Sequence, residues 1–328
     1  MKIGIVGGAG MLGQKLANRL LEHGQLSGER ITQLLLADQT TPVAPPSDVV
    51  DVVSIDADIS QASDCDRIID YRPDVIFHLA AVVSGQAEAD FDLGYRINVD
   101  GTKQLCESMR KVGSGYCPRV VFTSSVAVYG GPYPDVIDDD FHVTPHTSYG
   151  AHKVMGEILM SDYSRKGFLD AVSLRLPTVC VRPGSPNAAA SGVFSNILRE
   201  PLTGQAATLT VSRDVSMVFC SPRTAVGFLM HAAVLDSSRL GNRRSLMMPA
   251  LRASIVDEIE ALARVAGEEA VSLITTKIDP VAEATVRAWD FPEFTSARAR
   301  ELGFVGDSSV DDLIRIFLED EVQMRQKG

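Results

Sequence analysis

Tyr149 and Lys153, four residues apart, are the side chains in this sequence whose types and spacing most directly indicate chemistry. On a helix, positions i and i+4 share one face, so the phenol and the ammonium group would be neighbours. A tyrosine hydroxyl has an ordinary pKa of about 10, and a nearby cation lowers such a value by about 1 to 3 pH units. The pair therefore predicts a general acid and base that exchanges a proton with a substrate alcohol or carbonyl.

A hydroxyl and an amide are further candidates for the same site. Residues 119–123 have the pattern of a buried strand that runs into Ser124 and Ser125. The carboxyl ends of parallel strands are where α/β sheets bind ligands, although a serine there also commonly turns or caps the chain. Asn98, in YRINVDGT, precedes an amphipathic stretch. It is either a member of the site or a helix N-cap.

A glycine-rich loop at the start of the chain predicts a nucleotide site. The strand-like residues 3–6 lead into the sequence GGAGMLG, and a helical pattern follows. Glycines in such a turn let the backbone approach a pyrophosphate, which the N–H groups of the following helix then bind. An acidic residue at the end of the next strand accepts the ribose hydroxyls and repels a 2′-phosphate, so Asp38 favours NAD over NADP. The residues of this loop in the predicted cofactor site are Gly7, Gly10, Met11, Leu12 and Gly13.

The order of the elements that must position these residues predicts an α/β fold. Apolar runs alternate with helical patterns through the first half of the chain, which is typical of βαβ units and a doubly wound, Rossmann-like parallel sheet. The predicted strands cover residues 2–6, 32–37, 49–55, 75–79, 119–123 and 171–176, and the predicted helices include 11–23, 98–112 and 149–163. A strand and helix at 215–235 and a final amphipathic helix at 310–324 follow.

The predicted domains interleave. After Pro177 the sequence becomes rich in Gly, Pro, Ser and Asn. We therefore expect an NAD-binding Rossmann domain at 1–176, to which 215–240 returns, and a smaller α/β substrate-binding lobe formed by 177–214 and 241–328.

Composition limits the possible partners. The formal net charge is −11, and no basic stripe is present, which argues against nucleic acid. No long apolar run predicts a membrane span or a signal peptide. The five cysteines form no CxxC pair and the six histidines no HxxxH pattern, so we expect free thiols, no metal and a cytoplasmic location.

Taken in order, these motifs resemble the extended short-chain dehydrogenases, a family that includes nucleotide-sugar epimerases and dehydratases. The similar segments are GGAGMLG, Asp38, DADI, HLAA, NVDGT, FTSSVAVYG, YGAHK and RLPTVCVRPG, with RELGF near the C-terminus. The resemblance implies a seven-stranded sheet, a homodimer formed through helices near 92–112 and 149–166, and NAD as cofactor. It implies that Tyr149 is the acid and base, that Lys153 holds the nicotinamide ribose, that Ser125 binds the reacting oxygen and that Asn98 supports a proton relay. It also places these residues at the cofactor: Asp58, Ile59, Leu79, Ala80, Ala81, Pro177 and Val179.

Departures from the family pattern narrow the reaction. Dehydratases of the family carry Asp-Glu directly after the catalytic hydroxyl residue, where this chain has Val126 and Ala127, so the carboxylates that expel water are absent. Epimerases commonly have Asn at the position of Thr178. They also carry a diphosphate signature of which only Arg213 and the following Asp remain here.

Segments 175–184 and 181–205 are instead similar to family members that oxidise the 2-hydroxyl of a four-carbon sugar acid with NAD. A guanidinium group suits the carboxylate of such an acid. The predicted substrate residues are Ser125, Thr178, Arg182, Asn187, Ser191, Arg199 and Arg213. Two alternatives stay open: an epimerase that retains NAD and acts on a nucleotide sugar, and a binding protein that senses the NAD/NADH ratio. The intact Tyr, Lys and Ser set argues against the sensor, which needs no acid or base.

Overall fold

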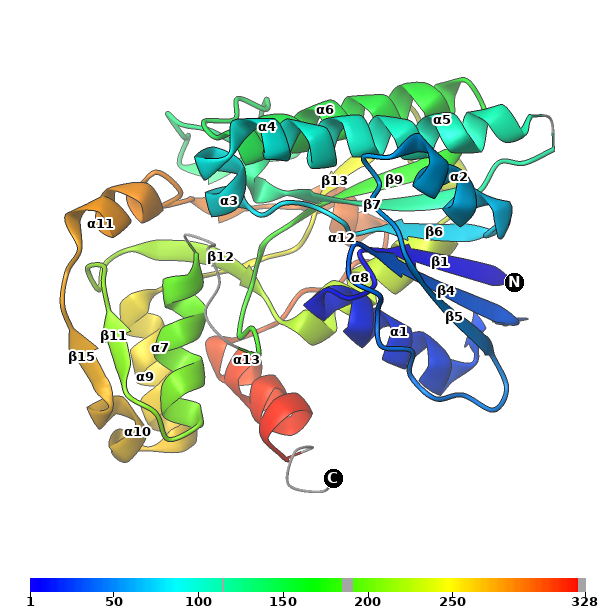
Figure 1. Ribbon diagram of the computed structural model, residues 1–328. Coiled ribbons are helices and arrows are strands. Elements are labelled where there is room, and N and C mark those ends of the chain that lie inside the picture. The colour runs from blue at the N-terminus through cyan, green and yellow to red at the C-terminus, as the bar shows by residue number, and fades with distance from the viewer. Residues whose placement is uncertain (114, 185–190, 324–328) are drawn as a thin grey trace. The chain divides into compact units, whose positions relative to one another are not determined.

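The computed structural model describes residues 1–113, 115–184 and 191–323 (Figure 1). The chain forms two compact units. The first comprises residues 1–128, 145–175 and 226–247, and the second comprises 129–144, 176–225 and 248–328.

A seven-stranded sheet forms the centre of the first unit. Its strand order is β13-β9-β7-β6-β1-β4-β5, and the pairs on either side of β1 are parallel. The order reverses beside β1, which is the topological switch point at which such sheets bind ligands outside their carboxyl ends. The strands are β1 (Lys2–Val6), β4 (Gln33–Asp38), β5 (Asp51–Asp56), β6 (Val75–His78), β7 (Arg119–Ser125), β9 (Asp170–Leu176) and β13 (Ser245–Met247).

Helices cover both faces of this sheet. Figure 1 shows α4, α5 and α6 on one side and α1 on the other. The helices are α1 (Met11–His23), α2 (Ala62–Asp70), α3 (Ser84–Ala89), α4 (Phe91–Gly94), the π-helix η1 (Tyr95–Gly101), α5 (Thr102–Val112) and α6 (Ser148–Arg165). Short elements complete the unit: a hairpin of β2 (Gln25–Leu26) and β3 (Glu29–Arg30), and the 3-10 turns η2 (Val126–Val128) and η3 (Ser237–Arg239).

Side chains at helical spacing explain how these layers pack. The buried residues of α1 are Gly13, Leu16, Ala17 and Leu20, which form one apolar stripe. On the opposite face of the sheet, α6 approaches β7 closely at Gly156, where a Cβ atom would lie 2.5 Å from Cζ of Phe122. The site-bearing helix α6 is therefore fixed against the strand that ends at Ser125.

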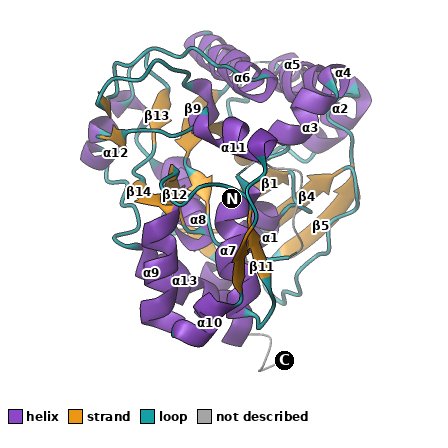
Figure 2. Ribbon diagram, turned by 90° about the vertical axis from the view of Figure 1, so that its left-hand side faces the viewer, coloured by secondary structure: helices purple, strands orange, loops and turns teal. Residues whose placement is uncertain are grey.

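The second unit contains small sheets and several helices (Figure 2). Its main sheet has the order β10-β12-β14, with β12 and β14 antiparallel. The strands are β10 (Thr178–Val179), β12 (Ser216–Cys220) and β14 (Leu251–Ser254), with the pairs β11 (Ala207–Leu209) and β15 (Ile274–Thr276), and β8 (Val136–Ile137) and β16 (Glu293–Phe294). The helices are α7 (Gly192–Leu202), α9 (Ile255–Ala266), α10 (Glu268–Ser272), α11 (Pro280–Arg287), α12 (Ala297–Glu301), α13 (Val310–Phe317) and the π-helix η4 (Leu318–Gln323).

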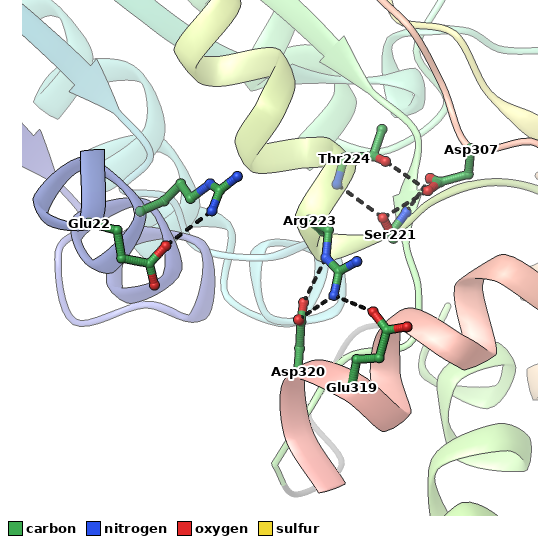
Figure 3. A network of polar contacts seen from close by, with 8 residues as sticks. Glu22, Ser221, Arg223, Thr224, Asp307, Glu319 and Asp320 are labelled. Carbon is green, nitrogen blue, oxygen red and sulfur yellow. Dashed lines mark hydrogen bonds and ion pairs between the residues drawn. The ribbon is translucent and has the colours of Figure 1, made fainter. Parts of the chain in front are cut away.

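The start of α8 (Pro222–Val234) is held by acidic residues from the end of the chain (Figure 3). Asp307 accepts hydrogen bonds from the backbone N–H of Ser221 at 2.7 Å and from the Thr224 hydroxyl at 2.7 Å. Arg223 binds Glu319 and Asp320, with N–O distances of 2.9 and 2.5 Å. A carboxylate at a helix N-terminus satisfies N–H groups that have no partner within the helix.

The borders of the two units differ from the predicted ones. Residues 129–144 lie in the second unit, where the ring of Tyr129 packs 5.8 Å from those of Phe141 and Phe294. Residues 245–247 form β13 and pair with β9, so they belong to the large sheet and not to the smaller lobe. Helix α8 begins in the second unit and continues in the first. Within the described ranges, no helix combines the length and apolar character needed to cross a membrane.

Candidate active site

Tyr149 and Lys153 lie in the first two turns of α6, whose N-terminus is capped by the Thr147 side chain. Gly150 lets this end of the helix approach the segment after β7, because a Cβ atom there would overlap the carbonyl oxygen of Ala127. Lys153 Nζ lies 5.5 Å from the centroid of the Tyr149 ring and 4.9 Å from that of the Phe122 ring. The ammonium group is buried, and the predicted shared face of the two residues is present.

Ser125 lies at the carboxyl end of β7, near enough to the Tyr149 phenol for its hydroxyl to lower the pKa of that group. Its Oγ also accepts the backbone N–H of Ala127 at 3.1 Å, which fixes the hydroxyl within a tight turn. The structure thus brings together the three side chains that the sequence suggested for acid-base chemistry.

The electrostatics of the pair differ from the sequence-based expectation. Burial raises the pKa of Tyr149 to about 12, and the nearby Ser125 hydroxyl, which acts to lower it, only partly opposes this rise. Burial also lowers the pKa of Lys153 to about 7, while Glu157 acts in the opposite direction. The predicted lowering of the Tyr149 pKa is therefore wrong for the protein alone, because desolvation outweighs the attraction between phenolate and cation.

Glu157 and Arg175 form a buried ion pair next to these residues, and the sequence analysis missed both. Glu157 follows Lys153 by one helical turn and accepts the Ser124 hydroxyl at 2.6 Å. Its spacing of four from Lys153 was a usable signal, since Tyr149, Lys153 and Glu157 recur on one face of α6. Arg175 lies on β9, and no local pattern connects it to α6.

The glycine loop after β1 has the shape that a dinucleotide needs. Gly7 has a φ of +96°, and a Cβ atom there would lie 2.6 Å from the backbone nitrogen of Ala80. A Cβ atom at Gly13 would overlap the carbonyl oxygen of Gly7. Gly10 caps α1 without a side-chain hydrogen bond, so the first N–H groups of the helix, from Met11 and Leu12, are available to a phosphate. The loop therefore fits a bound pyrophosphate.

Asp38 ends β4 beside this loop. Its Oδ2 accepts the backbone N–H of Ala9 at 3.0 Å and its Oδ1 accepts that of Gln39 at 2.8 Å. The carboxylate is thus oriented toward the glycine loop, where an adenosine ribose would be recognised. Asp58 follows β5 by two residues. Burial acts to raise its pKa, but hydrogen bonds with Ser60 and Gln39 outweigh this effect and the pKa is lowered overall. Ile59 is buried against η1, because a Cβ atom at Gly101 would lie 2.7 Å from its Cγ1.

The segment after β6 borders the loop from the other side. The backbone N–H groups of Leu79 and Ala80 donate to Val6 at 2.8 and 2.9 Å, and Leu79, Ala80 and Ala81 are all half-buried. Asn98 is not an N-cap, because it lies within the π-helix η1. Its buried amide forms two hydrogen bonds with the backbone of Val82, at 2.8 and 3.0 Å.

Among the described residues, the predicted substrate residues other than Ser125 belong to the second unit, as do Pro177 and Val179: they are Thr178, Arg182, Ser191, Arg199 and Arg213. Thr178 and Val179 form β10 beside Phe219 and Cys220. Arg213 is exposed. Asn187 lies outside the described residues.

Arg182 and Arg199 have different surroundings within the second unit. The Arg199 guanidinium binds Glu200 at 2.6 Å, together with Asn196 Oδ1 and the carbonyl oxygen of Arg182. Arg182 Nη2 donates only to the Ser191 hydroxyl, at 3.3 Å, and meets no carboxylate among the residues that the structure describes. Burial lowers the pKa of Arg182, and the charge of Arg199 contributes. Arg182 is therefore a half-buried cation suited to an anionic partner.

Comparisons with known proteins show the family of this chain. Residues 3–230 match the NAD dependent epimerase/dehydratase family. D-erythronate dehydrogenase of Cupriavidus necator is 46% identical over 324 residues, which cover 98% of each chain. D-erythronate dehydrogenase of Haemophilus influenzae is 38% identical and covers 97% of this chain and 99% of its own. A solved structure described as a nucleoside-diphosphate-sugar epimerase from Agrobacterium tumefaciens is 50% identical, with a TM-score of 0.95 and coverage of 98% of this chain and 95% of its own.

The family match spans the glycine loop, Asp38, Ser125, Tyr149 and Lys153, which are the residues that form the site described above. The chain therefore belongs to the NAD-dependent epimerase/dehydratase family, the extended short-chain dehydrogenases.

Proposed function

We propose that this protein uses NAD to oxidise the 2-hydroxyl of a small sugar acid such as D-erythronate to the 2-oxo acid. The observation that carries the proposal is the set of Ser125, Tyr149 and Lys153 in a chain with near-full-length similarity to two D-erythronate dehydrogenases. This reaction also agrees with Val126 and Ala127, which leave no carboxylate to expel water as a dehydratase must.

In the proposed reaction Tyr149 removes the hydroxyl proton of the substrate while the hydrogen on the same carbon leaves as hydride. Bound NAD supplies the hydride acceptor and a positive charge that favours the phenolate. Ser125 donates a hydrogen bond to the substrate oxygen, and Lys153 holds the nicotinamide ribose. The raised pKa of Tyr149 means that the phenol keeps its proton in the protein alone, so we expect it to act as a base only when the positive charge of NAD is added to that of Lys153.

For the acid itself we propose Arg182 as the residue that binds the carboxylate. Its guanidinium is largely buried, and the hydroxyl of Ser191 orients it at 3.3 Å. A planar guanidinium forms two parallel hydrogen bonds to a carboxylate. Arg199 is already engaged by Glu200, so we assign it to the support of Arg182, whose carbonyl oxygen it binds at 3.1 Å. Thr178 and Arg213 remain further candidates for substrate contact.

At the level of the whole protein we propose that the first unit binds NAD and the second contributes the substrate residues. We also propose a homodimer through α4, η1, α5 and α6. Large apolar side chains are exposed on these helices, with Phe91 58% and Ile158 63% exposed. We further propose that the protein acts in carbohydrate metabolism and that it is located in the cytoplasm.

The alternative is a nucleoside-diphosphate-sugar epimerase, which the description of the Agrobacterium structure favours. An epimerase returns the hydride to its substrate and keeps the cofactor, whereas a dehydrogenase releases NADH. We would incubate the purified protein with NAD and a panel of four- to six-carbon aldonic acids and follow NADH absorbance. NADH formed with D-erythronate or a close relative supports the proposal. No NADH with any acid, together with NAD that copurifies with the protein, would favour the epimerase.

A further inference from the structure

His152 is a buried histidine between the two catalytic residues of α6, and the reaction described above gives it no task. Its ring packs edge-on against Tyr95, with the centroids 4.6 Å apart and an angle of 79° between the planes. Gly94 makes room for the ring, since a Cβ atom there would lie 2.8 Å from Cε1 of His152. The side chain thus fills the space between α6 and η1.

The hydrogen bonds around Asn98 fix the roles of the imidazole nitrogens. The backbone N–H of Val82 can only donate, so the Asn98 atom that faces it at 2.8 Å is Oδ1. The amide nitrogen then donates to the Val82 carbonyl oxygen at 3.0 Å and to His152 Nδ1 at 3.3 Å. His152 Nδ1 is therefore an acceptor, and the proton of the neutral ring is on Nε2. Burial lowers the pKa of His152, and the charge of Lys153 adds to this effect, so the neutral form is favoured.

Packing alone does not explain a histidine at this position. Nε2 is buried and has no hydrogen-bond partner among the residues that the structure describes. A buried donor without a partner destabilises the fold, whereas a phenylalanine would fill the same space without that penalty. The polar function of the ring must therefore reside in Nδ1, the atom that meets Asn98.

We propose that His152 is a positioning residue whose Nδ1, by accepting the Asn98 amide, ties the segment after β6 to the helix that carries Tyr149 and Lys153. Val82 directly follows Leu79, Ala80 and Ala81, the residues that we assign to the cofactor cleft. The chain of contacts from Val82 through Asn98 to His152 fixes the position of one wall of that cleft relative to α6. The inference rests on this assignment of the cleft and on NAD as cofactor, but not on the identity of the sugar acid.

Two substitutions separate the hydrogen bond from the packing. His152→Phe keeps a ring for Tyr95 and removes the acceptor. His152→Asn removes the ring but places Oδ1 close to the position of Nδ1, where it can accept the Asn98 amide. We would measure the Kd for NADH by nicotinamide fluorescence, and Tm, for both variants and for His23→Phe, a control at the exposed end of α1. No substrate is needed, so failure of the proposed sugar-acid activity would leave this test intact.

We expect His152→Phe to bind NADH about tenfold more weakly, because the acceptor for the Asn98 amide is lost. Its Tm should stay near that of the wild type, because the packing is kept and removal of the partnerless Nε2 donor offsets the loss of this hydrogen bond. His152→Asn should bind NADH within about twofold of the wild type although its Tm falls, because the bond persists and a cavity forms. The reverse order, with His152→Phe binding normally and His152→Asn weakly, would overturn the proposal.

If His152→Phe does not fold, His152→Gln replaces it. The longer glutamine side chain places its amide near the position of Nε2 and not near that of Nδ1, so it offers Asn98 no acceptor. The variant should therefore bind NADH as weakly as we expect for His152→Phe. Binding as tight as that of the wild type would overturn the proposal equally.

Discussion

Glu157 on α6 and Arg175 on β9 form a two-point ion pair, with Nε donating to Oε1 over 2.9 Å and Nη2 donating to Oε2 over 2.7 Å. Only 6% of the Glu157 side chain and 13% of the Arg175 side chain are exposed. Because Glu157 lies one turn after Lys153, the pair fixes the catalytic helix to the sheet at the level of the site. The geometry is thus set by a contact between residues 18 positions apart in the sequence.

Glu157→Gln should therefore destabilise the protein by about 3 to 5 kcal/mol, because a buried guanidinium loses the carboxylate that neutralises it. Urea denaturation measures the change in the free energy of unfolding. Asp162→Asn is the matched control on the same helix, since its ion pair with Arg165 is more than half exposed on both sides. The control should lose less than about 1 kcal/mol. Equal losses in the two variants would show that burial of the Glu157 pair has no energetic consequence.

The lowered pKa of Lys153 should appear as a pH dependence of stability. Between about 7, its pKa in the folded protein, and the higher ordinary value of a lysine, the unfolded chain binds a proton that the folded protein does not. The unfolded state then binds more protons, so this residue makes the folded state more stable as the pH rises.

Unfolding measured at pH 6, 7.5 and 9 should therefore show the wild type gaining stability relative to Lys153→Met by up to about 1.4 kcal/mol per pH unit above pH 7. Lys166→Met, at the exposed end of the same helix, is the control and should show no such trend. A difference between wild type and Lys153→Met that stays constant over this range would contradict the lowered pKa.

Gly7→Ala should abolish NADH binding, because the new methyl group would meet the backbone of Ala80 at a position whose φ of +96° already disfavours a side chain. Gly24→Ala is the control. Gly24 has a φ of +63°, and a Cβ atom there would have no other atom within 4 Å, so only backbone strain of about 1 to 2 kcal/mol applies. The control should lower Tm and leave the Kd for NADH unchanged. NADH binding by Gly7→Ala at wild-type strength would refute the role given to this turn.

Arg182→Met should raise KM for the sugar acid by about tenfold or more while the Kd for NADH stays constant, because a charge-assisted contact to the carboxylate is lost. Steady-state kinetics measure the KM for the sugar acid, and NADH fluorescence measures the Kd for NADH. Arg300→Met, which changes an exposed arginine of the same unit that has no proposed role in the site, tests whether loss of any positive charge has this effect. An unchanged KM in Arg182→Met would remove this residue from the proposed substrate site.

Local sequence patterns predicted the parts of the fold that depend on local physics. The apolar spacing placed α1 at residues 11–23, where the structure has it. The runs at 32–37 and 119–123 marked two strands of the large sheet, which extend to Asp38 and Ser125 in the structure. The spacing of Tyr149 and Lys153 placed both on one face of α6 because helical geometry fixes that relation.

Local patterns could not predict contacts between segments that are distant in the sequence. Nothing near Arg175 indicates Glu157 as its partner. The sequence left Asn98 as either a member of the site or a helix N-cap, and it did not indicate that the amide would bind the backbone of Val82. The pKa of Tyr149 was predicted in the wrong direction, because spacing reveals the neighbouring cation but not the burial that outweighs it. The role inferred for His152 likewise depends on atoms from three segments of the chain.

The most direct test of the central claim compares the wild type with Tyr149→Phe in the oxidation of D-erythronate by NAD, with the Kd for NADH measured on the same samples. The proposed mechanism predicts NADH formation by the wild type and a loss of about 100- to 10,000-fold in kcat for Tyr149→Phe, with nearly unchanged NADH binding. Turnover at the wild-type rate by Tyr149→Phe would show that this phenol is not the acid and base of the reaction.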